Sequence, residues 1–290
     1  YYNFAKAIIP TITVDEVSAL AKKHLNRKNM VIVAQGPSEG VKHITKEEAI
    51  AVLDKVESSN LEPYKDQVTE ASLINEDLKG SKIIATKKLP QFDADEWTLE
   101  NGAKVVFRKA DYEKDQVQVS SYSKGGTSLY GIDKLASAQV TDQFIGAYGL
   151  GDYDAITLRK LLTGKQAQAG VSIGGLSESV GGASTPNDFE TLMQLIYLRF
   201  EKPRFDKEVH NTLMQRNYAA IENSANNPQK IMQDSVSMIM SNYSPRTLLF
   251  GKEFLDKVSI EQIEEIYRDR IKDISDFTFF IVGNIDAETV

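Results

Sequence analysis

The sequence predicts an α+β protein in which helices pack against an antiparallel-rich sheet. Three observations support this prediction. Runs with the two-residue alternation of strands and runs with helical periodicity are mixed along the chain and do not alternate one by one. Strand-like runs come in pairs separated by short turns, as around Asn101-Gly102, which favours antiparallel hairpins. A capped helix followed by a strand-like run occurs near both ends of the chain, which indicates a repeated structural unit.

Length and composition are those of an ordinary globular protein and exclude several classes of function. The 290 residues are 41% hydrophobic and 26% charged, and at roughly 150 residues per domain they allow about two domains. The net charge of −7 argues against a nucleic-acid partner. The apolar run 277–282 is far shorter than the about 20 residues that a membrane span needs. The absence of cysteine excludes disulfides, thiolate nucleophiles and cysteine-ligated metals.

The chain begins at Tyr1 without an initiator methionine or a signal-like segment, so we interpret it as a piece of a longer protein. Any export signal would precede Tyr1. The compartment is therefore not predicted, and an exported, for example periplasmic, location and a cytoplasmic one both stay open.

The N-terminal region predicts two capped helices with a strand between them. Residues 13–16 (TVDE) and 45–48 (TKEE) both fit a capping box, in which a hydroxyl and an acid three residues later cap the start of a helix. Apolar residues follow each box at helical spacing. The β-rich run 30–36 closes on Gly36 and predicts a buried strand.

A polar segment separates this region from the rest of the chain. Residues 57–96 contain Pro63 and Pro90 and sustain neither the helical nor the strand period, which predicts a linker. We therefore expect three parts. Residues 1–56 form the C-terminal end of a preceding homologous module, 57–96 form the linker between the two halves of the protein, and 97–290 form a second module.

The second module predicts strands first and helices later. Residues 97–107 form a hairpin around Asn101-Gly102, a dipeptide that suits a type I′ turn. The remaining predicted elements of the first half are a strand from Val117 to Lys124, a helix from Ile132 to the glycines at 146–151, a short helix ending at Leu162, and paired strands at 168–176 and 177–184.

Three further helices and a repeat of the N-terminal arrangement complete the module. The helices have predicted core positions at Phe189, Leu192, Leu195 and Ile196, at Val209, Leu213 and Tyr218, and at Ile231, Val236 and Ile239, with Pro228 at a first helical position. A capping box at 259–262 (SIEQ) then begins a helix, and a strand that we expect to be buried follows at 277–284.

Only three histidines are present in the chain. None of the histidines His24, His43 and His210 belongs to an H-E-x-x-H or H-x-x-E-H motif, so this chain offers no zinc site of that kind and we expect these residues to be surface or half-buried positions. Asp152 and Asp154 precede a predicted helix, where capping explains them better than acid–base catalysis.

No nucleophile or phosphate-binding loop emerges either. Residues 175–179 (GLSES) miss the final glycine of a nucleophile elbow and lie between strands, so we do not expect Ser177 to be catalytic. The segments 125–127 (GGT) and 164–165 (GK) lack the spacing of a nucleotide-binding loop and are interpreted as tight turns. We assign no catalytic residue and no metal ligand, and substrate-binding residues stay unassigned.

Several segments of the chain resemble the pitrilysin/insulinase family of zinc metallopeptidases. They are 99–105, 124–127 (KGGT), 181–190 (GGASTPNDFE), 192–195, 203–206 and 279–285, which resemble the third of four homologous modules in the long members, and 1–40, which resembles the tail of the second. The resemblance implies a pitrilysin-like module, the fold also described as metalloprotease LuxS/MPP-like.

The chain departs from the family at the metal site. Active modules carry H-x-x-E-H on the helix after the glycine turn, whereas residues 133–142 here read DKLASAQVTD. The resemblance therefore implies the non-catalytic C-terminal half of a clamshell peptidase. That half would help to enclose a peptide substrate, no cofactor would be held in this chain, and zinc would be held by the catalytic half upstream in the same polypeptide.

Two other functions are left open. A non-enzymatic structural or assembly subunit with the same fold would have no zinc site in the parent protein or in a partner. A hydrolase using Ser177 would lose its activity when that serine is replaced by alanine.

Overall fold

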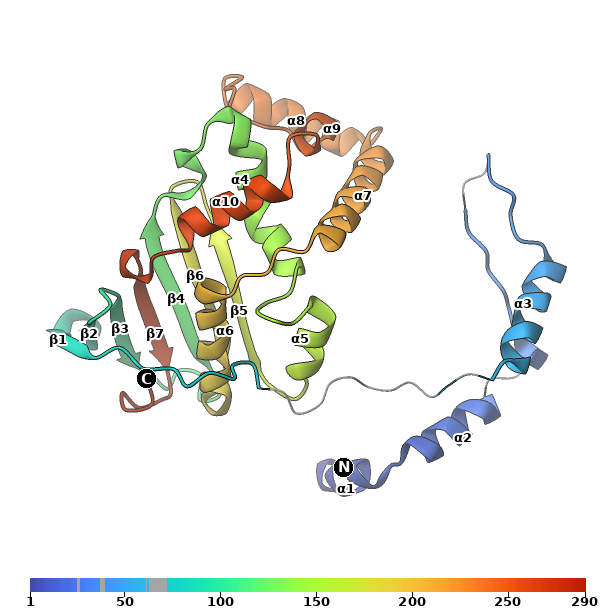
Figure 1. Cartoon of the computed structure of the whole chain (residues 1–290), viewed down its shortest axis with the longest axis horizontal. Coiled ribbons are helices and arrows are strands. Elements are labelled where there is room, and N and C mark those ends of the chain that lie inside the picture. The colour runs from blue at the N-terminus through green and yellow to red at the C-terminus, as the bar shows by residue number, and fades with distance from the viewer. Residues whose placement is uncertain (25–26, 37–39, 61, 63–71) are drawn as a thin grey trace. The chain divides into compact units, whose positions relative to one another are not determined.

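The computed structural model describes residues 1–24, 27–36, 40–60, 62 and 72–290, which form two compact units, Tyr1–Lys65 and Asp66–Val290 (Figure 1). Each unit is considered by itself. No helix in these ranges combines the length and the apolar composition required to cross a bilayer.

The regular elements of the first unit are all helical in the residues that the structure describes. They are α1 (Tyr2–Ile8), η1 (Ile9–Thr11), α2 (Val14–His24), η2 (Arg27–Asn29) and α3 (Lys46–Ser58). Both predicted capping boxes are confirmed. The Glu16 N–H donates to Thr13 Oγ1 at 3.2 Å and the Thr13 N–H donates to Glu16 Oε2 at 2.8 Å, and Thr45 and Glu48 form the same reciprocal pair.

The strand predicted at 30–36 is absent. Residues 30–36 have no regular secondary structure, and Val31 and Val33 are 84% and 74% exposed. A strand requires a neighbour to pair its backbone N–H and C=O groups, and the described part of this unit provides none. The prediction that the apolar run 30–36 is buried was therefore wrong.

The second unit is built on one sheet, and the predicted α+β class is confirmed. Its strands are β1 (Ile83–Leu89), β2 (Ala94–Leu99), β3 (Lys104–Lys109), β4 (Val117–Lys124), β5 (Ala167–Ile173), β6 (Ser177–Ser184) and β7 (Thr278–Gly283). The strand order in the described residues is β1-β2-β3-β7-β4-β6-β5, and every neighbouring pair except β3 and β7 is antiparallel. The sheet is therefore antiparallel-rich, as expected.

Helices cover one face of this sheet. They are α4 (Ile132–Ala147), α5 (Ala155–Leu161), α6 (Phe189–Glu201), α7 (Lys207–Ser224), α8 (Pro228–Met240), α9 (Lys252–Leu255) and α10 (Ile260–Arg270), with 3₁₀ turns η3 (Pro90–Phe92), η4 (Gly126–Leu129), η5 (Pro186–Asp188) and η6 (Ile274–Asp276). Helices α4, α6 and α10 lie across the strands, while α8 and α9 lie beyond the ends of β4, β5 and β6 (Figure 1). The main core fills the space between α4, α6, α10 and the sheet.

The second unit begins earlier in the sequence than predicted. Strand β1 and the first residues of β2 lie inside the segment 57–96 that was predicted as a linker. Leu73 and Ile74 also pack against a buried cluster that includes Leu195, and Glu76 forms an ion pair with Lys202. Because β1 is an edge strand whose residues are almost all exposed, no alternation of polar and apolar residues marks it in the sequence.

The hairpin between β2 and β3 is confirmed, but its turn is not type I′. A type I′ turn requires positive φ at both central residues, and of Asn101 and Gly102 only the glycine has it, at +89°. The loop has three residues instead of two, because the Gly102 N–H donates to Leu99 O and the Leu99 N–H donates to Ala103 O, both at 2.9 Å. Gly102 therefore serves as the left-handed residue that ends a three-residue hairpin loop.

Two further expectations for the helices are corrected. The predicted core positions of α8, Ile231, Val236 and Ile239, are exposed, because no described element of the second unit packs over them. The capping box at Ser259 is only half formed. Ser259 Oγ accepts from the Gln262 N–H at 3.2 Å, but the Gln262 side chain turns to Ser137 on α4.

Candidate functional site

The face of the sheet opposite the helices is exposed within the second unit. Strand β4 shows this most clearly, because its residues alternate between buried and exposed along its whole length. Strands β5 and β7 follow the same pattern. We call this surface the open sheet face, defined by the exposed residues Gln118, Ser120, Tyr122, Gln168, Gly170, Ser172, Phe280 and Val282.

The register of β4 and β7 concentrates large apolar side chains on this face. Ser120 lies opposite Phe280, and Gln118 lies opposite Val282. Tyr122, Phe280 and Val282 are 48%, 40% and 38% exposed, although they stand on two central strands. Covering exposed apolar groups in the middle of a sheet with another molecule or segment removes them from water, which lowers the free energy.

Strand β6 contributes only small side chains to the open sheet face. The residues that it contributes to this face are all small: Ser177, Ser179, Gly181 and Ala183. Ala183 lies opposite Gln118 on β4 and opposite Gln168 on β5, so two glutamines stand on either side of one methyl group. A side chain at Gly181 would place its Cβ 2.4 Å from Val119 O, so the glycine is required for the close approach of β4.

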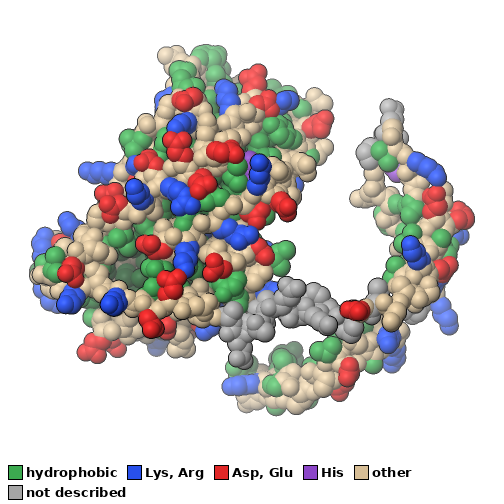
Figure 2. Space-filling view, in the orientation of Figure 1, with side chains coloured by type: hydrophobic (Ala, Val, Ile, Leu, Met, Phe, Trp, Pro, Cys, Tyr) green, Lys and Arg blue, Asp and Glu red, His purple; other side chains and the backbone are tan. Residues whose placement is uncertain are grey.

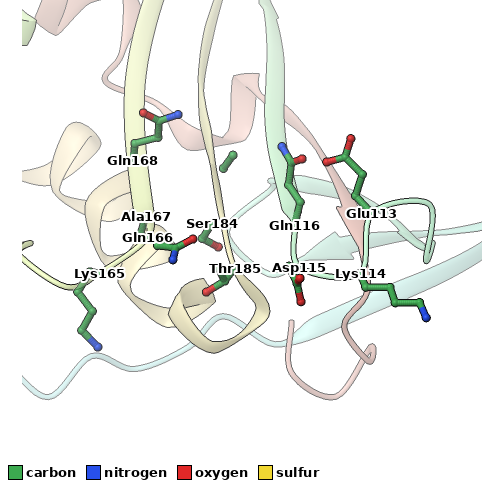
Figure 3. A pocket seen from close by; sticks show the side chains of 11 residues that line it. Glu113, Lys114, Asp115, Gln116, Lys165, Gln166, Ala167, Gln168, Ser184 and Thr185 are labelled. Atoms are coloured by element: carbon green, nitrogen blue, oxygen red, sulfur yellow. The ribbon is translucent and has the colours of Figure 1, made fainter. Parts of the chain in front are cut away.

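A polar hollow of about 660 Å³ lies at the C-terminal end of β6 (Figure 3). It is lined by Glu113, Lys114, Asp115, Gln116, Lys165, Gln166, Ala167, Gln168, Ala183, Ser184 and Thr185. Gln116 and Gln168 lie on either side of it, with Ser184 and Thr185 between them in this view (Figure 3). A side-chain amide both donates and accepts hydrogen bonds, so these glutamines can bond both the N–H and the C=O groups of a peptide main chain.

A second, smaller hollow lies between the polar hollow and the exposed apolar residues of β7. It has a volume of about 250 Å³, shares Glu113 and Gln116 with the first, and adds Gln118 and Val282 from the open sheet face. The open sheet face thus joins amide-lined and apolar surfaces along neighbouring strands. This combination can bind an extended chain without a catalytic group.

A buried carboxylate fixes the glycine turn at the other end of β4. Glu178 is 2% exposed and accepts hydrogen bonds from the Gly126 N–H at 2.6 Å and from Ser123 Oγ at 3.1 Å, and Arg270 Nη1 lies 3.5 Å from its Oε1. Gly126 has a φ of +65°, and a Cβ there would lie 2.3 Å from Gly174 O. The predicted role of the segment 125–127 as a tight turn is therefore confirmed, and all the partners of Glu178 are structural.

The histidines lie in different environments, each described within its own unit. His24 and His43 are exposed on the first unit. His210 is buried on α7, where its Nδ1 and the hydroxyl of Tyr148 are hydrogen-bonded at 2.8 Å and the ring of Phe144 lies beside it. Burial lowers the pKa of His210, and the charge of Glu261 opposes this shift in part. His210 therefore serves as a core residue, and the expectation that it is a surface or half-buried position was wrong.

The other candidate residues of the sequence have structural surroundings. Ser177 begins β6, is half-buried, and its carbonyl accepts from the Gly174 N–H. Asp154 caps α5 by accepting from the Ile156 and Thr157 N–H groups at 2.8 and 2.9 Å, and these bonds, with that to Thr157 first, lower its pKa. Asp152 is exposed beside it. The capping role predicted for Asp154 is confirmed.

The zinc that the family resemblance implies does not fit the residues of this chain. Helix α4, where the family resemblance places the zinc-binding helix of active modules, contains no histidine. Across the ranges that the structure describes, no group of three or more His, Asp or Glu side chains is arranged to hold a metal ion. No chemical step is therefore derived through zinc in this chain.

Sequence reasoning missed the open sheet face. Residues 277–284 were predicted as a buried strand, and β7 does form there, but Phe280 and Val282 are exposed. A continuous apolar run signals a strand with both faces covered, and it does not say whether the second cover belongs to the same unit. The alternation of apolar and polar residues at 117–120 was the available signal that one face is open.

Curated relatives of this chain are zinc proteases, although no known family profile matches it. The chain is 21% identical over 285 residues to the Zinc protease PQQL-like of Arabidopsis thaliana, covering 97% of this chain and 27% of the relative. It is 20% identical over 206 residues to the Probable zinc protease PqqL of Haemophilus influenzae, covering 68% of this chain and 21% of the relative. The chain thus spans about a quarter of the length of the curated relatives it matches.

Solved structures share the fold. The periplasmic protease PqqL from Escherichia coli superimposes with a TM-score of 0.66 at 18% identity, covering 99% of this chain and 32% of that one. A peptidase M16 inactive domain from Pseudomonas fluorescens gives a TM-score of 0.53 at 16% identity, covering 67% and 47%. These findings confirm the predicted resemblance. The chain is similar to zinc proteases of the pitrilysin type, the M16 peptidases, and it has the fold of their inactive modules.

Proposed function

We propose that this chain is part of the non-catalytic half of a zinc-dependent metalloendopeptidase and that its open sheet face lines the chamber in which peptides are bound. Residues 1–56 are then the end of a preceding homologous module. The inactive module is then 97–290 extended back through β1 to Leu73, and the linker is the part of 57–96 that precedes Leu73. Zinc and hydrolysis belong to the catalytic half of the same polypeptide, and this half supplies enclosure and binding.

The observation that carries this proposal is the exposure of Tyr122, Phe280 and Val282 in the middle of the sheet, next to amide-lined hollows. Binding sites for flexible ligands combine apolar area, which supplies free energy, with a few polar groups that fix orientation. Glutamine side chains such as Gln118 and Gln168 bond main-chain amides whatever the side chains of the peptide are. The face is therefore suited to peptides of varied sequence.

The similar proteins support a protein or peptide substrate. The curated relatives are named as zinc proteases. The structure of the ferredoxin protease FusC in complex with Arabidopsis ferredoxin has a TM-score of 0.62 to this chain at 16% identity and covers 85% of it. That protease is seen in complex with a protein, and we extend the same class of partner to the parent of this chain.

The test is the substitution Phe280→Thr in the full-length parent. Threonine keeps the preference for a strand and removes the aromatic surface. We expect KM for a quenched peptide substrate to rise several-fold while kcat is retained, because the lost contact is remote from the bond that is cut. The matched control is Phe92→Thr, which removes an equally large side chain that is 62% exposed in η3, outside the open sheet face.

Equal kinetic constants for Phe280→Thr and the parent protein, with the fold intact by circular dichroism, would contradict a role of this face in binding. A loss of kcat in both variants would point to a general defect and would likewise fail to support the proposal. Absence of any zinc-dependent cleavage by the parent would instead favour the structural-subunit function.

A further inference from the structure

Basic side chains border the open sheet face. Arg108 on β3 lies opposite Val282 of β7, and Lys104 stands at the start of β3 on the same side of that strand. Lys124 ends the exposed side of β4. We call Lys104, Arg108 and Lys124 the basic border. On the side of the second unit drawn in Figure 2, by contrast, acidic and basic side chains are interspersed.

The acidic side chains near the basic border are balanced by other basic ones. Glu96 on β2 lies directly opposite Lys87 on β1. The formal charges of the residues that line the polar hollow cancel, since the charged ones are Glu113, Asp115, Lys114 and Lys165. In the part of the chain that the structure describes, no member of the basic border forms an ion pair. The border is therefore positive, although the whole chain carries a net charge of −7.

A tyrosine orients the guanidinium of Arg108. Its Nη2 donates to the Tyr112 hydroxyl at 2.9 Å, and its central carbon lies 5.5 Å from the centre of the Tyr112 ring. Among the described residues, the Nε of Arg108 is buried and has no hydrogen-bond partner. Because an unpaired buried donor costs free energy, the guanidinium favours a further acceptor.

The acceptor that fits this pair of side chains is a carboxylate. A guanidinium presents a planar fork of N–H groups that bonds both oxygens of a carboxylate. The Tyr112 hydroxyl accepts from Arg108 and still has its own hydrogen to donate. Tyr112 is 78% exposed and lines the smaller hollow together with Gln118 and Val282, so the pair adjoins the open sheet face.

The spacing of the cations indicates acidic side chains and not a peptide C-terminus. Strand residues advance by about 3.3 Å each, which places the backbones of Lys104 and Arg108 about 13 Å apart, too far for one terminal carboxylate to bind both. Phe280 lies on the neighbouring strand, opposite the residue midway between them. An extended peptide with two acidic side chains four residues apart and an apolar side chain between them matches this arrangement.

We propose that the open sheet face binds acidic peptide segments, with Arg108 and Tyr112 holding one carboxylate and Lys104 the other. Lys124 adds to the positive potential that draws such segments to the face. The proposal rests on the proposed function, because it names the class of peptide that this face takes.

The experiment measures the affinity of the full-length parent for three labelled peptides by fluorescence anisotropy, with a chelator present so that the peptides stay uncut. The peptides have amidated C-termini and share a central apolar residue. Two positions four residues apart around it carry glutamate, glutamine or lysine. We expect the Kd of the glutamate peptide to be about tenfold below that of the lysine peptide, and the difference to shrink as salt is added.

Variants of Arg108 test which residue sets this preference. Arg108→Gln should reduce the difference between the glutamate and lysine peptides several-fold while the Kd of the glutamine peptide is retained. Arg108→Lys should keep part of the preference, because the charge remains and the fork is lost. Lys207→Gln is the matched control, since it removes one positive charge from the exposed start of α7, outside the basic border, and should leave the preference unchanged.

Three results overturn the proposal: equal Kd values for the three peptides, tighter binding of the lysine peptide, or a preference for glutamate that Arg108→Gln leaves unchanged. A fourth peptide has a free C-terminal carboxylate and no acidic side chain. If it binds as tightly as the glutamate peptide, the proposal also fails, because a terminus is then sufficient.

Cleavage, measured separately in the parent with zinc, distinguishes this proposal from the proposed function. A preference for the glutamate peptide that Arg108→Gln reduces, without cleavage of any peptide, sinks the protease function and keeps the site for acidic peptides. Cleavage that Phe280→Thr weakens, without any preference for charge, keeps the proposed function and sinks the site for acidic peptides.

Discussion

The turn between β4 and α4 depends on Gly126 and on the carboxylate of Glu178. Gly126 approaches the backbone of the β5–β6 hairpin, and its N–H is held by the buried carboxylate of Glu178. The same glycine has a φ in the left-handed region. Gly126 is therefore required both by conformation and by space.

We expect Gly126→Ala to destabilise the protein more than Gly164→Ala. Both glycines have positive φ, so each alanine costs roughly 1–2 kcal/mol of conformational strain. Only Gly126 adds a backbone clash, which costs about 1–3 kcal/mol more, since no atom lies within 4 Å of the Cβ position at Gly164. Urea denaturation of both variants measures the difference, and equal losses would mean that the turn relaxes freely.

The burial of His210 predicts a pH dependence of stability. Because its pKa is lowered in the folded state, the unfolded chain binds a proton first as the pH falls. The free energy of unfolding is then fully retained above the unfolded pKa of about 6.5 and decreases below it. The decrease from about pH 7.5 to about pH 5.5 is expected to be smaller in His210→Gln. An identical pH profile for that variant would rule out His210 as the cause.

Sequence reasoning at this scale identified residue types but not their neighbours. The glycines at 125–126 were interpreted as a turn from composition alone, because φ in the left-handed region favours glycine. Glu178 was not singled out, since its partners Ser123, Gly126 and Arg270 are distant in sequence. Long-range polar partners are decided by the fold, and a single sequence does not encode them as a local pattern.

At the scale of the elements, a serine joins α4 to α10. Ser137 is fully buried, its Oγ accepts from the Ser259 N–H at 3.2 Å, and it donates to Gln262 Oε1 at 2.7 Å. It therefore takes the place that Gln262 would occupy in a complete capping box. The start of α10 is capped partly by its own residues and partly by a neighbouring helix.

Replacing Ser137 by alanine leaves the Ser259 N–H without its partner. A buried unpaired donor costs about 1–3 kcal/mol, so Ser137→Ala should lower the free energy of unfolding by that amount. Ser235 on α8 provides the control, because its hydroxyl donates to Ile231 O at an exposed position and its removal should cost less than about 0.5 kcal/mol. Thermal unfolding of both variants decides, and similar Tm values would show that Ser259 finds another acceptor.

The elements with their own local signals were predicted, and those that depend on neighbours were not. Capping residues and helical spacing located α2, α3, α4 and α10. Strand β1 was missed because an exposed edge strand needs no apolar alternation, and residues 30–36 were overpredicted because their pairing partner is not supplied by the described unit. The exposed apolar residues of β7 and of α8 share this origin, since no described element of the second unit covers them.

At the scale of the whole molecule, the open sheet face fits the proposed function of a module that works inside a larger protein. The open sheet face combines apolar and amide groups and suits a changing ligand. Helix α4 presents no histidine where active modules bind zinc. The central claim is that this chain contributes binding and enclosure to a zinc peptidase whose catalytic groups lie elsewhere in the polypeptide.

The most direct test is the cleavage of an internally quenched peptide library by the 290-residue chain and by the full-length parent, each with zinc and with a chelator. We predict that only the parent cuts and that the chelator abolishes cleavage. Cleavage by the 290-residue chain alone would contradict the claim, and its loss in Ser177→Ala would then identify the nucleophile. Failure of the parent to cut with zinc present would contradict the claim in the other direction and assign the chain to a structural subunit.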